Sequence, residues 1–229
     1  TRNDDYINDQ ISTIITTSNA LISKLDEYKI FSELIFIEWN PNSKKESLKK
    51  LLSKLKQSPF IKISLTSVDC YFHKKLKYSN VRPLSGEWAS NVGIRQALGK
   101  FIMIKAQDTF YSDGFYKILS EKKLKKNQVN IIERFTVDKA QIPDLLKKNK
   151  NNLQLNFKRK KRNILLPYSA KNSGDSLILE RKYWNKFRGI KEKNQSLTLG
   201  LDGAFFYTAI GYGLLVNIMD HKNSYILKP

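Results

Sequence analysis

Short apolar runs alternate with segments of helical periodicity along most of this chain, and that alternation limits its fold more than any other feature. Runs of four to eight apolar residues are typical of buried strands, whereas leucine and isoleucine at intervals of three and four are typical of helices. The expected strands occupy residues 33–38, 61–68, 101–104, 129–135 and 214–219. The expected helices occupy residues 11–30, 47–55, 87–98, a short stretch around 115–119, 180–187 and a segment starting near 202.

Strands that alternate with helices are joined by crossover connections, which place neighbouring strands parallel. The pattern therefore predicts an α/β fold with a mostly parallel central sheet and helices on both faces. Residues 70–86 are expected to form an irregular loop, and Gly99 stands where the C-cap of the preceding helix is expected. The charged stretch 139–162 interrupts the alternation, but no repeat or long linker demands a second domain.

The size and composition suit a globular protein. The 229 residues are 41% hydrophobic, enough for a substantial core, and no apolar run approaches the eighteen residues of a membrane span. The single cysteine, Cys70, excludes an internal disulfide, and the N-terminus has no hydrophobic signal region. We expect a cytoplasmic protein, with peripheral contact to a membrane left open.

The charge is strongly positive. Lys and Arg number 41 against 21 Asp and Glu, a formal net charge of +20, which favours nucleic acid, acidic lipid or a phosphorylated ligand as partner. Most of the lysines are scattered over expected helix faces and loops, as on a solvated surface. The basic run at 158–162 supports an alternative interpretation as a nucleic-acid or anionic-surface binding module, although it lacks interleaved aromatic residues.

Polar residues follow several of the expected strands. Glu38 ends the run at 33–38 and Trp39 follows it, Asp108 follows 101–104, and Arg134 lies within 129–135. In open parallel sheets, ligands bind at the carboxyl ends of the strands. Carboxylates and an aromatic ring there would suit a ribose, a flat base and a metal-bridged diphosphate. Taken alone, Glu38 could equally be a surface carboxylate and Asp108 a turn former.

Other phosphate chemistries lack their motifs. Neither a P-loop nor the glycine-rich dinucleotide fingerprint is found, which disfavours a kinase or a dehydrogenase. One cysteine and two histidines fall short of a zinc ligand set, so oxygen ligands and Mg²⁺ or Mn²⁺ are the more plausible metal chemistry.

Four segments then occur in a characteristic order: TRNDDY at 1–6, EWNP at 38–41, NVGIRQALG at 91–99, and Asp108. This series resembles family-2-type glycosyltransferases of the GT-A (Rossmann-like) fold. Glu133-Arg134, Gly174-Asp175, the segment 184–189 and Asp202 extend the resemblance over nearly the whole chain.

The resemblance implies one glycosyltransferase domain over 1–229, with a nucleotide-sugar-binding half at 1–135 and an acceptor-side half at 164–229, as a fragment of a longer protein. It implies a UDP- or dTDP-linked donor and a glycan or other hydroxyl acceptor, with no specific nucleic acid. The implied donor-binding residues are Thr1, Arg2, Asn3, Asp5, Glu38, Asn91, Arg95, Gln107, Asp108 and Arg134.

The resemblance also implies a mechanism. A divalent metal, Mn²⁺ or Mg²⁺, would be held by Asp108, with His221 as a further ligand, and would assist departure of the diphosphate. In the inverting version Asp202 would take the proton of the acceptor hydroxyl, with Asp175 as the alternative base. The segment at Asp108 has one acidic residue where many relatives have two. That reduced motif leaves open a degenerate domain that binds sugar nucleotides without turnover.

Overall fold

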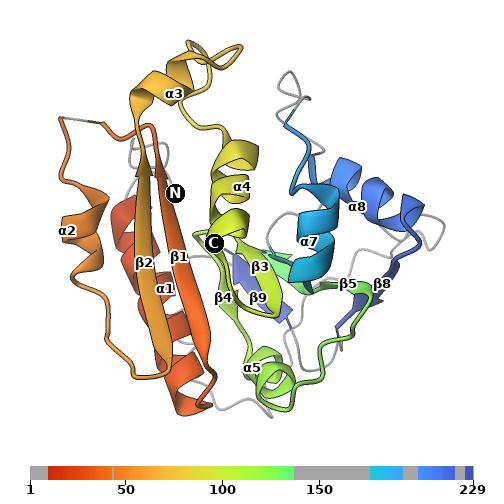
Figure 1. The fold of residues 1–229 in the computed structure, drawn as a ribbon. Coiled ribbons are helices and arrows are strands. Elements are labelled where there is room, and N and C mark those ends of the chain that lie inside the picture. Colours follow the sequence, from red (N-terminus) through yellow and green to blue (C-terminus); the bar gives the residue numbers. More distant parts are fainter. Residues whose placement is uncertain (1–9, 43, 137–175, 193–200, 220–224, 229) are drawn as a thin grey trace.

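The computed structural model describes residues 10–42, 44–136, 176–192, 201–219 and 225–228, with side chains of 133–136, 201–204 and 225–228 excepted. Its elements form an α/β fold, as the alternation predicted (Figure 1). The helices are α1 (Gln10–Glu27), α2 (Leu48–Leu52), α3 (Cys70–Lys74), α4 (Gly86–Gln96), α5 (Asp113–Ser120), α7 (Arg181–Phe187) and α8 (Leu201–Gly211). The strands are β1 (Ser32–Trp39), β2 (Ile61–Val68), β3 (Phe101–Lys105), β4 (Phe110–Tyr111), β5 (Gln128–Ile131), β6 (Glu133–Thr136), β7 (Ser176–Glu180), β8 (Leu215–Ile218) and β9 (Tyr225–Lys228).

The strands pair in both directions, so the expectation of a mostly parallel sheet needs correction. β1 pairs with β2 in parallel, and a second sheet has the order β3-β7-β5-β8. Within it, β7 is antiparallel to both β3 and β5, whereas β5 and β8 are parallel. The third sheet, β4-β9-β6, is likewise mixed. No strand was expected at β7, and this strand is the one that reverses direction between its neighbours.

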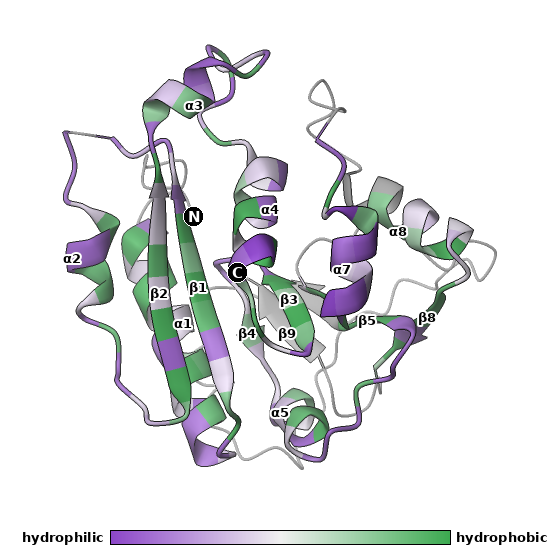
Figure 2. Cartoon of the chain, viewed as in Figure 1, coloured by the Kyte–Doolittle hydropathy of each residue, from purple (hydrophilic) through white to green (hydrophobic). Residues whose placement is uncertain are grey.

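Side chains that alternate along the strands divide the core into two layers. Phe36 of β1 packs in one hydrophobic cluster with α1, α2 and α5, and this cluster also contains Ile178 of β7. Ile102 of β3 and Leu177 of β7 belong to the opposite cluster, with α4, α7 and α8. Figure 2 shows β1 and β3 as largely hydrophobic, as strands covered on both faces should be.

Most of the predicted boundaries hold, and three local differences have physical causes. The loop expected at 70–86 begins with α3, because the Asp69 carboxylate accepts a hydrogen bond from the Tyr71 amide and caps the turn. The strand expected at 129–135 is divided into β5 and β6, which pair in different sheets. Gly99 is not the C-cap of α4, since the helix ends at Gln96 and the backbone is extended at Ala97.

Within the described residues, we find no helix with both the length and the apolar character needed to cross a membrane.

Candidate functional site

The carboxyl ends of β1 and β3 lie at the same edge of the fold. The Glu33 carboxylate, near the start of β1, accepts hydrogen bonds from the Leu98 and Gly99 amides, just before β3 begins (2.8 and 3.2 Å). The two strands therefore start at the same level. Both strands then run along one cavity. It is lined by residues 32–37 of β1 and by every residue of β3. The opposite ends of the strands, at Trp39 and Lys105, consequently share the other edge.

Asp108 and Gln107 lie in the turn that follows β3 at this edge. The Thr109 hydroxyl donates to the Ala106 carbonyl (2.9 Å), and the Thr17 hydroxyl of α1 donates to the Gln107 carbonyl (2.6 Å). The first bond closes the turn on itself, and the second attaches the turn to α1. Asp108 is half-buried there, so its backbone has a defined place at the end of the strand.

Lys105 is a residue of this edge that the sequence pattern did not single out. Its ammonium donates to the Ala106 carbonyl (2.8 Å) and lies 5.9 Å from the centre of the Tyr111 ring. Desolvation lowers the pKa of Lys105 to about 7, an effect that the charge of Asp108 opposes. The sequence held a signal: Lys105 is in phase with Phe101 and Met103, so a charged side chain falls on an apolar face of the strand.

Glu38 is buried, and both of its carboxylate oxygens accept hydrogen bonds within the protein. Its Oε1 accepts from the Leu48 amide at the start of α2 (3.1 Å), and its Oε2 accepts from the Ser67 hydroxyl of β2 (2.6 Å). Only 4% of its surface is exposed. The carboxylate thus joins α2 to both strands of the first sheet.

Trp39 is also turned inward, at 5% exposure. Its indole N–H donates to His73 Nδ1 (2.9 Å), which requires the proton of the neutral ring to be on Nε2, facing the Ser79 carbonyl at 3.2 Å. The ring of Trp39 therefore anchors α3 and the loop behind it, and its faces are covered by protein.

Asn91 is buried in α4 and bridges to the chain after α7. Its amide Nδ2 donates to the Ile190 carbonyl (2.9 Å) and to Glu192 Oε1 (2.8 Å), while its Oδ1 accepts from the Ile190 amide (2.8 Å). Arg95, one turn later, is exposed and lies 3.8 Å from the same carboxylate of Glu192. The structure thus groups Asn91 and Arg95 around Glu192, rather than with Asp108.

The remaining predicted residues are described in part or not at all. The backbone of Arg134 lies in β6, and that of Asp202 forms the second residue of α8; their side chains are outside the description. The following predicted residues lie outside the described residues altogether: Thr1, Arg2, Asn3, Asp5, Asp175 and His221.

The described part of the chain contains no group of three or more His, Cys, Asp or Glu side chains placed to hold a metal. Asp108 alone supplies a carboxylate in the turn after β3. A magnesium-type ion in such sites takes one or two protein carboxylates and completes its shell with water and substrate phosphate oxygens. A single carboxylate therefore fits a metal that arrives with the diphosphate, and does not fit a preformed metal cage.

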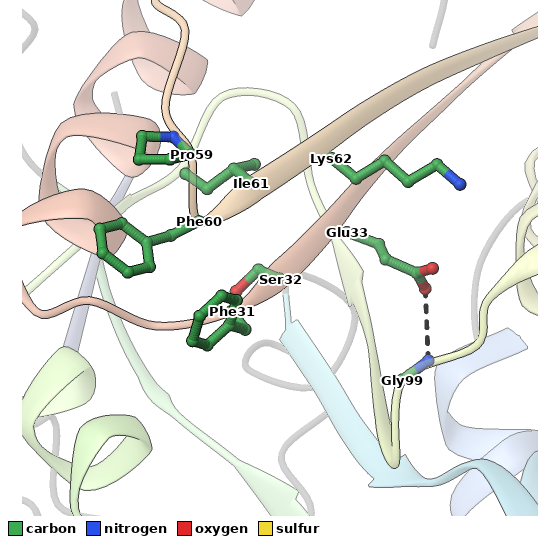
Figure 3. A pocket seen from close by; sticks show the side chains of 8 residues that line it. All are labelled: Phe31, Ser32, Glu33, Pro59, Phe60, Ile61, Lys62 and Gly99. Carbon is green, nitrogen blue, oxygen red and sulfur yellow. Dashed lines mark hydrogen bonds between the residues drawn. The ribbon is translucent and has the colours of Figure 1, made fainter.

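A separate hollow of about 420 Å³ lies at the opposite edge, at the amino ends of β1 and β2 (Figure 3). Phe31 and Phe60 form one wall, with ring centres 5.2 Å apart, and Figure 3 shows the Glu33 side chain directed to the Gly99 amide. None of the predicted donor-binding residues lines this hollow. It is therefore distinct from the edge that carries Asp108.

Comparison with protein-family models and with curated proteins finds no match to this chain.

Proposed function

We propose that this chain is a glycosyltransferase of the GT-A type, which transfers a sugar from a UDP- or dTDP-linked donor to a hydroxyl acceptor with inversion. The observation that carries the proposal is the position of Asp108, in a braced turn at the carboxyl edge shared by β1 and β3. Ligand sites of α/β sheets lie at that edge. The ordered sequence series supports the donor class.

In this proposal Asp108 orients the diphosphate end of the donor. A bound Mn²⁺ or Mg²⁺ would supply Lewis-acid stabilisation of the departing diphosphate. Lys105, three residues away, is a second source of positive charge at this edge. Because its pKa is about 7, an approaching diphosphate would favour its protonated form and gain an ion pair.

Arg95 can join the donor only by leaving Glu192. That pair is 3.8 Å apart and the Arg95 side chain is 67% exposed, so breaking it costs little. We place the proton transfer at Asp202, with Asp175 as the competing base. Either carboxylate would accept the proton of the acceptor hydroxyl as its oxygen attacks the anomeric carbon.

Calorimetric titration with a panel of UDP- and dTDP-sugars, with and without Mn²⁺, tests the donor class. Asp108→Asn should weaken metal-dependent binding at least tenfold. Asp69→Asn is the matched control, because Asp69 also follows a strand, β2, and asparagine preserves its helix cap. The absence of binding to every nucleotide sugar would end the proposal, and equal losses in the two variants would remove Asp108 from the site.

Transfer is tested separately from binding. If Asp202 is the base, Asp202→Asn should retain donor affinity and lose transfer of a radiolabelled sugar. If Asp175 is the base instead, Asp175→Asn should show that same loss of transfer with donor affinity retained. Full transfer by both variants would contradict a carboxylate base at either position.

A second candidate function, contact with an anionic membrane, is favoured by the surface of α3. Tyr71 and Phe72 are 58% and 57% exposed, and the ammonium of Lys75 lies 4.1 Å from the centre of the Tyr71 ring. Lys77 lies similarly over Tyr78, at 5.0 Å. Aromatic rings next to lysines suit the interface of an acidic bilayer.

Sedimentation with vesicles tests this contact. Binding to vesicles containing phosphatidylserine should fall when Tyr71 and Phe72 are both replaced by alanine, and it should be absent with pure phosphatidylcholine. Equal sedimentation of the double variant and the parent would contradict a role for α3.

A further inference from the structure

Residues 69–83 form a lobe at the carboxyl ends of β1 and β2. We call it the α3 lobe; it contains α3 and the loop that leads towards α4, and Figure 1 shows α3 beyond the ends of the two strands. Two hydrogen bonds attach the lobe to the end of β1. The Trp39 indole donates to His73 Nδ1 at 2.9 Å. The Asn40 side chain donates to the Pro83 carbonyl at 3.2 Å. The lobe is therefore held in a defined position at this edge of the fold.

The outer side of the α3 lobe combines apolar and basic side chains. Its exposed apolar residues are Tyr71, Phe72, Tyr78 and Val81, and its exposed lysines are Lys74, Lys75 and Lys77. The inner side is different, because Leu76 packs against the cluster that contains Trp39. The exposed rings are thus not part of the core of the lobe.

The lysines of the α3 lobe keep their charge available to an anionic surface. The ammonium of Lys75 lies 4.1 Å from the centre of the Tyr71 ring. That of Lys77 lies 5.0 Å from the centre of the Tyr78 ring. Among the described residues, no carboxylate forms an ion pair with either ammonium or with Lys74. An aromatic ring does not neutralise a cation, so lipid phosphates would supply the complementary charge while the rings enter the headgroup layer.

An acidic bilayer fits this surface better than a single-stranded nucleic acid. Proteins bind single strands by stacking successive bases on open aromatic faces. Here the Lys75 ammonium covers one face of Tyr71. The rings of Tyr71 and Phe72 meet edge to face, with centres 5.5 Å apart and planes at 76°, so they offer no continuous stacking platform.

The α3 lobe lies at the same edge of the fold as Asp108. It follows the carboxyl ends of β1 and β2, and Asp108 lies in the turn after β3, whose carboxyl end shares that edge. A planar bilayer that contacts the lobe would therefore lie beside the candidate donor site. A hydroxyl group in the headgroup layer would be presented to the donor there, whereas the hollow at Phe31 would face away from the membrane.

We propose that the acceptor is a membrane lipid, whose headgroup hydroxyl is presented to the donor by an acidic bilayer bound to the α3 lobe. This inference rests on the proposed transferase function and names its acceptor class. The hydroxyl oxygen of the lipid forms the new bond to the anomeric carbon, and the bond from that carbon to the diphosphate oxygen breaks. The carboxylate base takes the hydroxyl proton, and the nucleoside diphosphate leaves.

The test compares the same acceptor sugars in two forms. A panel of methyl glycosides supplies soluble acceptors, and the same sugars linked to dioleoylglycerol supply anchored acceptors in vesicles of phosphatidylserine and phosphatidylcholine. Transfer from a donor that binds should be at least tenfold faster to the anchored form. It should fall at least tenfold when the vesicles contain only phosphatidylcholine. Equal rates for the two forms, or donor binding without transfer to any anchored acceptor, would overturn the proposal.

Variants of the lobe test whether it is the docking surface. Replacing Tyr71 and Phe72 together by alanine should remove most of the advantage of the anchored form, with donor affinity in solution unchanged. Phe31→Ala is the matched control, because Phe31 is 82% exposed but lies at the opposite edge, and it should keep the advantage. Lys75→Gln should slow transfer to the anchored form about fivefold, whereas Lys62→Gln, at the opposite edge, should not. An undiminished advantage in the double alanine variant would overturn the proposal.

The outcomes also separate this proposal from the one on which it rests. Absence of binding to every nucleotide sugar would end both. Donor binding with equal or faster transfer to the soluble glycosides would leave the transferase proposal standing and overturn only the lipid acceptor. Binding of single-stranded oligothymidylate that depends on Tyr71 and Phe72, without binding to acidic vesicles, would identify a nucleic acid as the occupant and would likewise overturn the lipid acceptor.

Discussion

The side chain of Asn91 bonds to both backbone groups of Ile190, donating to its carbonyl at 2.9 Å and accepting from its amide at 2.8 Å. This paired geometry imitates one rung of a sheet and fastens the chain after α7 to α4. Because Asn91 is 1% exposed, water cannot replace either bond.

Asn91→Ala should therefore lower the free energy of unfolding by roughly 3 kcal/mol, since two backbone groups and Glu192 would lose a partner. Urea denaturation provides the measurement. Asn185→Ala, at an exposed position of α7, is the control and should change stability by less than about 0.5 kcal/mol. A small loss in both variants would show that Asn91 is replaceable by solvent.

Gly189 allows this contact, and its replacement should be costly. Its φ is +80°, and a Cβ there would lie 2.0 Å from Oδ1 of Asn91. Gly213 has the same φ of +80°, but a Cβ there would meet nothing within 4 Å, so Gly213→Ala isolates the backbone cost of about 1 kcal/mol. Gly189→Ala should cost at least about 2 kcal/mol more.

The clash can be confirmed with a double variant. In the Asn91→Ala background, Gly189→Ala should cost about as much as Gly213→Ala, because the opposing oxygen is gone. An undiminished cost would assign the effect to the backbone rather than to Asn91.

Lys105 should make stability depend on pH. Its pKa is about 7 in the folded protein and near the ordinary 10.5 when unfolded, so the unfolded chain binds more protons between these values. The free energy of unfolding should accordingly rise with pH through this window, by roughly 2 kcal/mol for this half-buried lysine. Below pH 7 Lys105 is charged in both states, and the full cost of burying its charge lowers the stability of the fold.

Lys105→Met should remove that slope and stabilise the protein most at pH 7. The control is Lys62→Met, which replaces an exposed lysine of β2 and should leave the slope unchanged. Chemical denaturation at pH 7, 8.5 and 10 distinguishes the two variants. If the free energy of unfolding depends on pH equally in the parent and in Lys105→Met, the lowered pKa of Lys105 is contradicted.

Variants of Glu38 distinguish a structural role of its carboxylate from a role in binding the donor. Glu38→Leu should destabilise the fold by about 2 to 3 kcal/mol, because the Leu48 amide and the Ser67 hydroxyl lose their acceptor. Ser67→Ala should cost about 1 kcal/mol. If Glu38→Gln instead keeps full stability and loses nucleotide-sugar affinity, the carboxylate serves the donor.

The sequence predicted local elements well and the pairing between distant ones poorly. Helix α1 follows from periodicity, because its buried residues recur every three or four positions, and β2 has the bounds that its apolar run predicted. β7 was missed although all five of its residues are buried, since a short apolar run carries no direction and no partner. Its antiparallel place between β3 and β5 is decided by tertiary packing alone.

In the candidate site, too, local positions were predictable from the sequence and contacts between distant residues were not. The place of Asp108 beyond a strand was predictable, because it depends on the local end of β3. The inward bonds of Glu38 and Asn91 were not, because their partners at Leu48, Ser67 and Ile190 are distant in the sequence and chosen by the fold. A polar residue beside a strand gives the same sequence signal whether it meets a ligand or a backbone amide.

The central position of β7 also sets an order for assembly. β3 and β5 are made early in synthesis, yet each acquires its shared neighbour only after Glu180 has been added. Long-range closure of this kind slows folding and exposes unpaired edges in the meantime. A nascent chain that stalls before β7 should consequently be a substrate for chaperones and prone to aggregate, whereas one that stalls beyond it can already join the middle of its sheet.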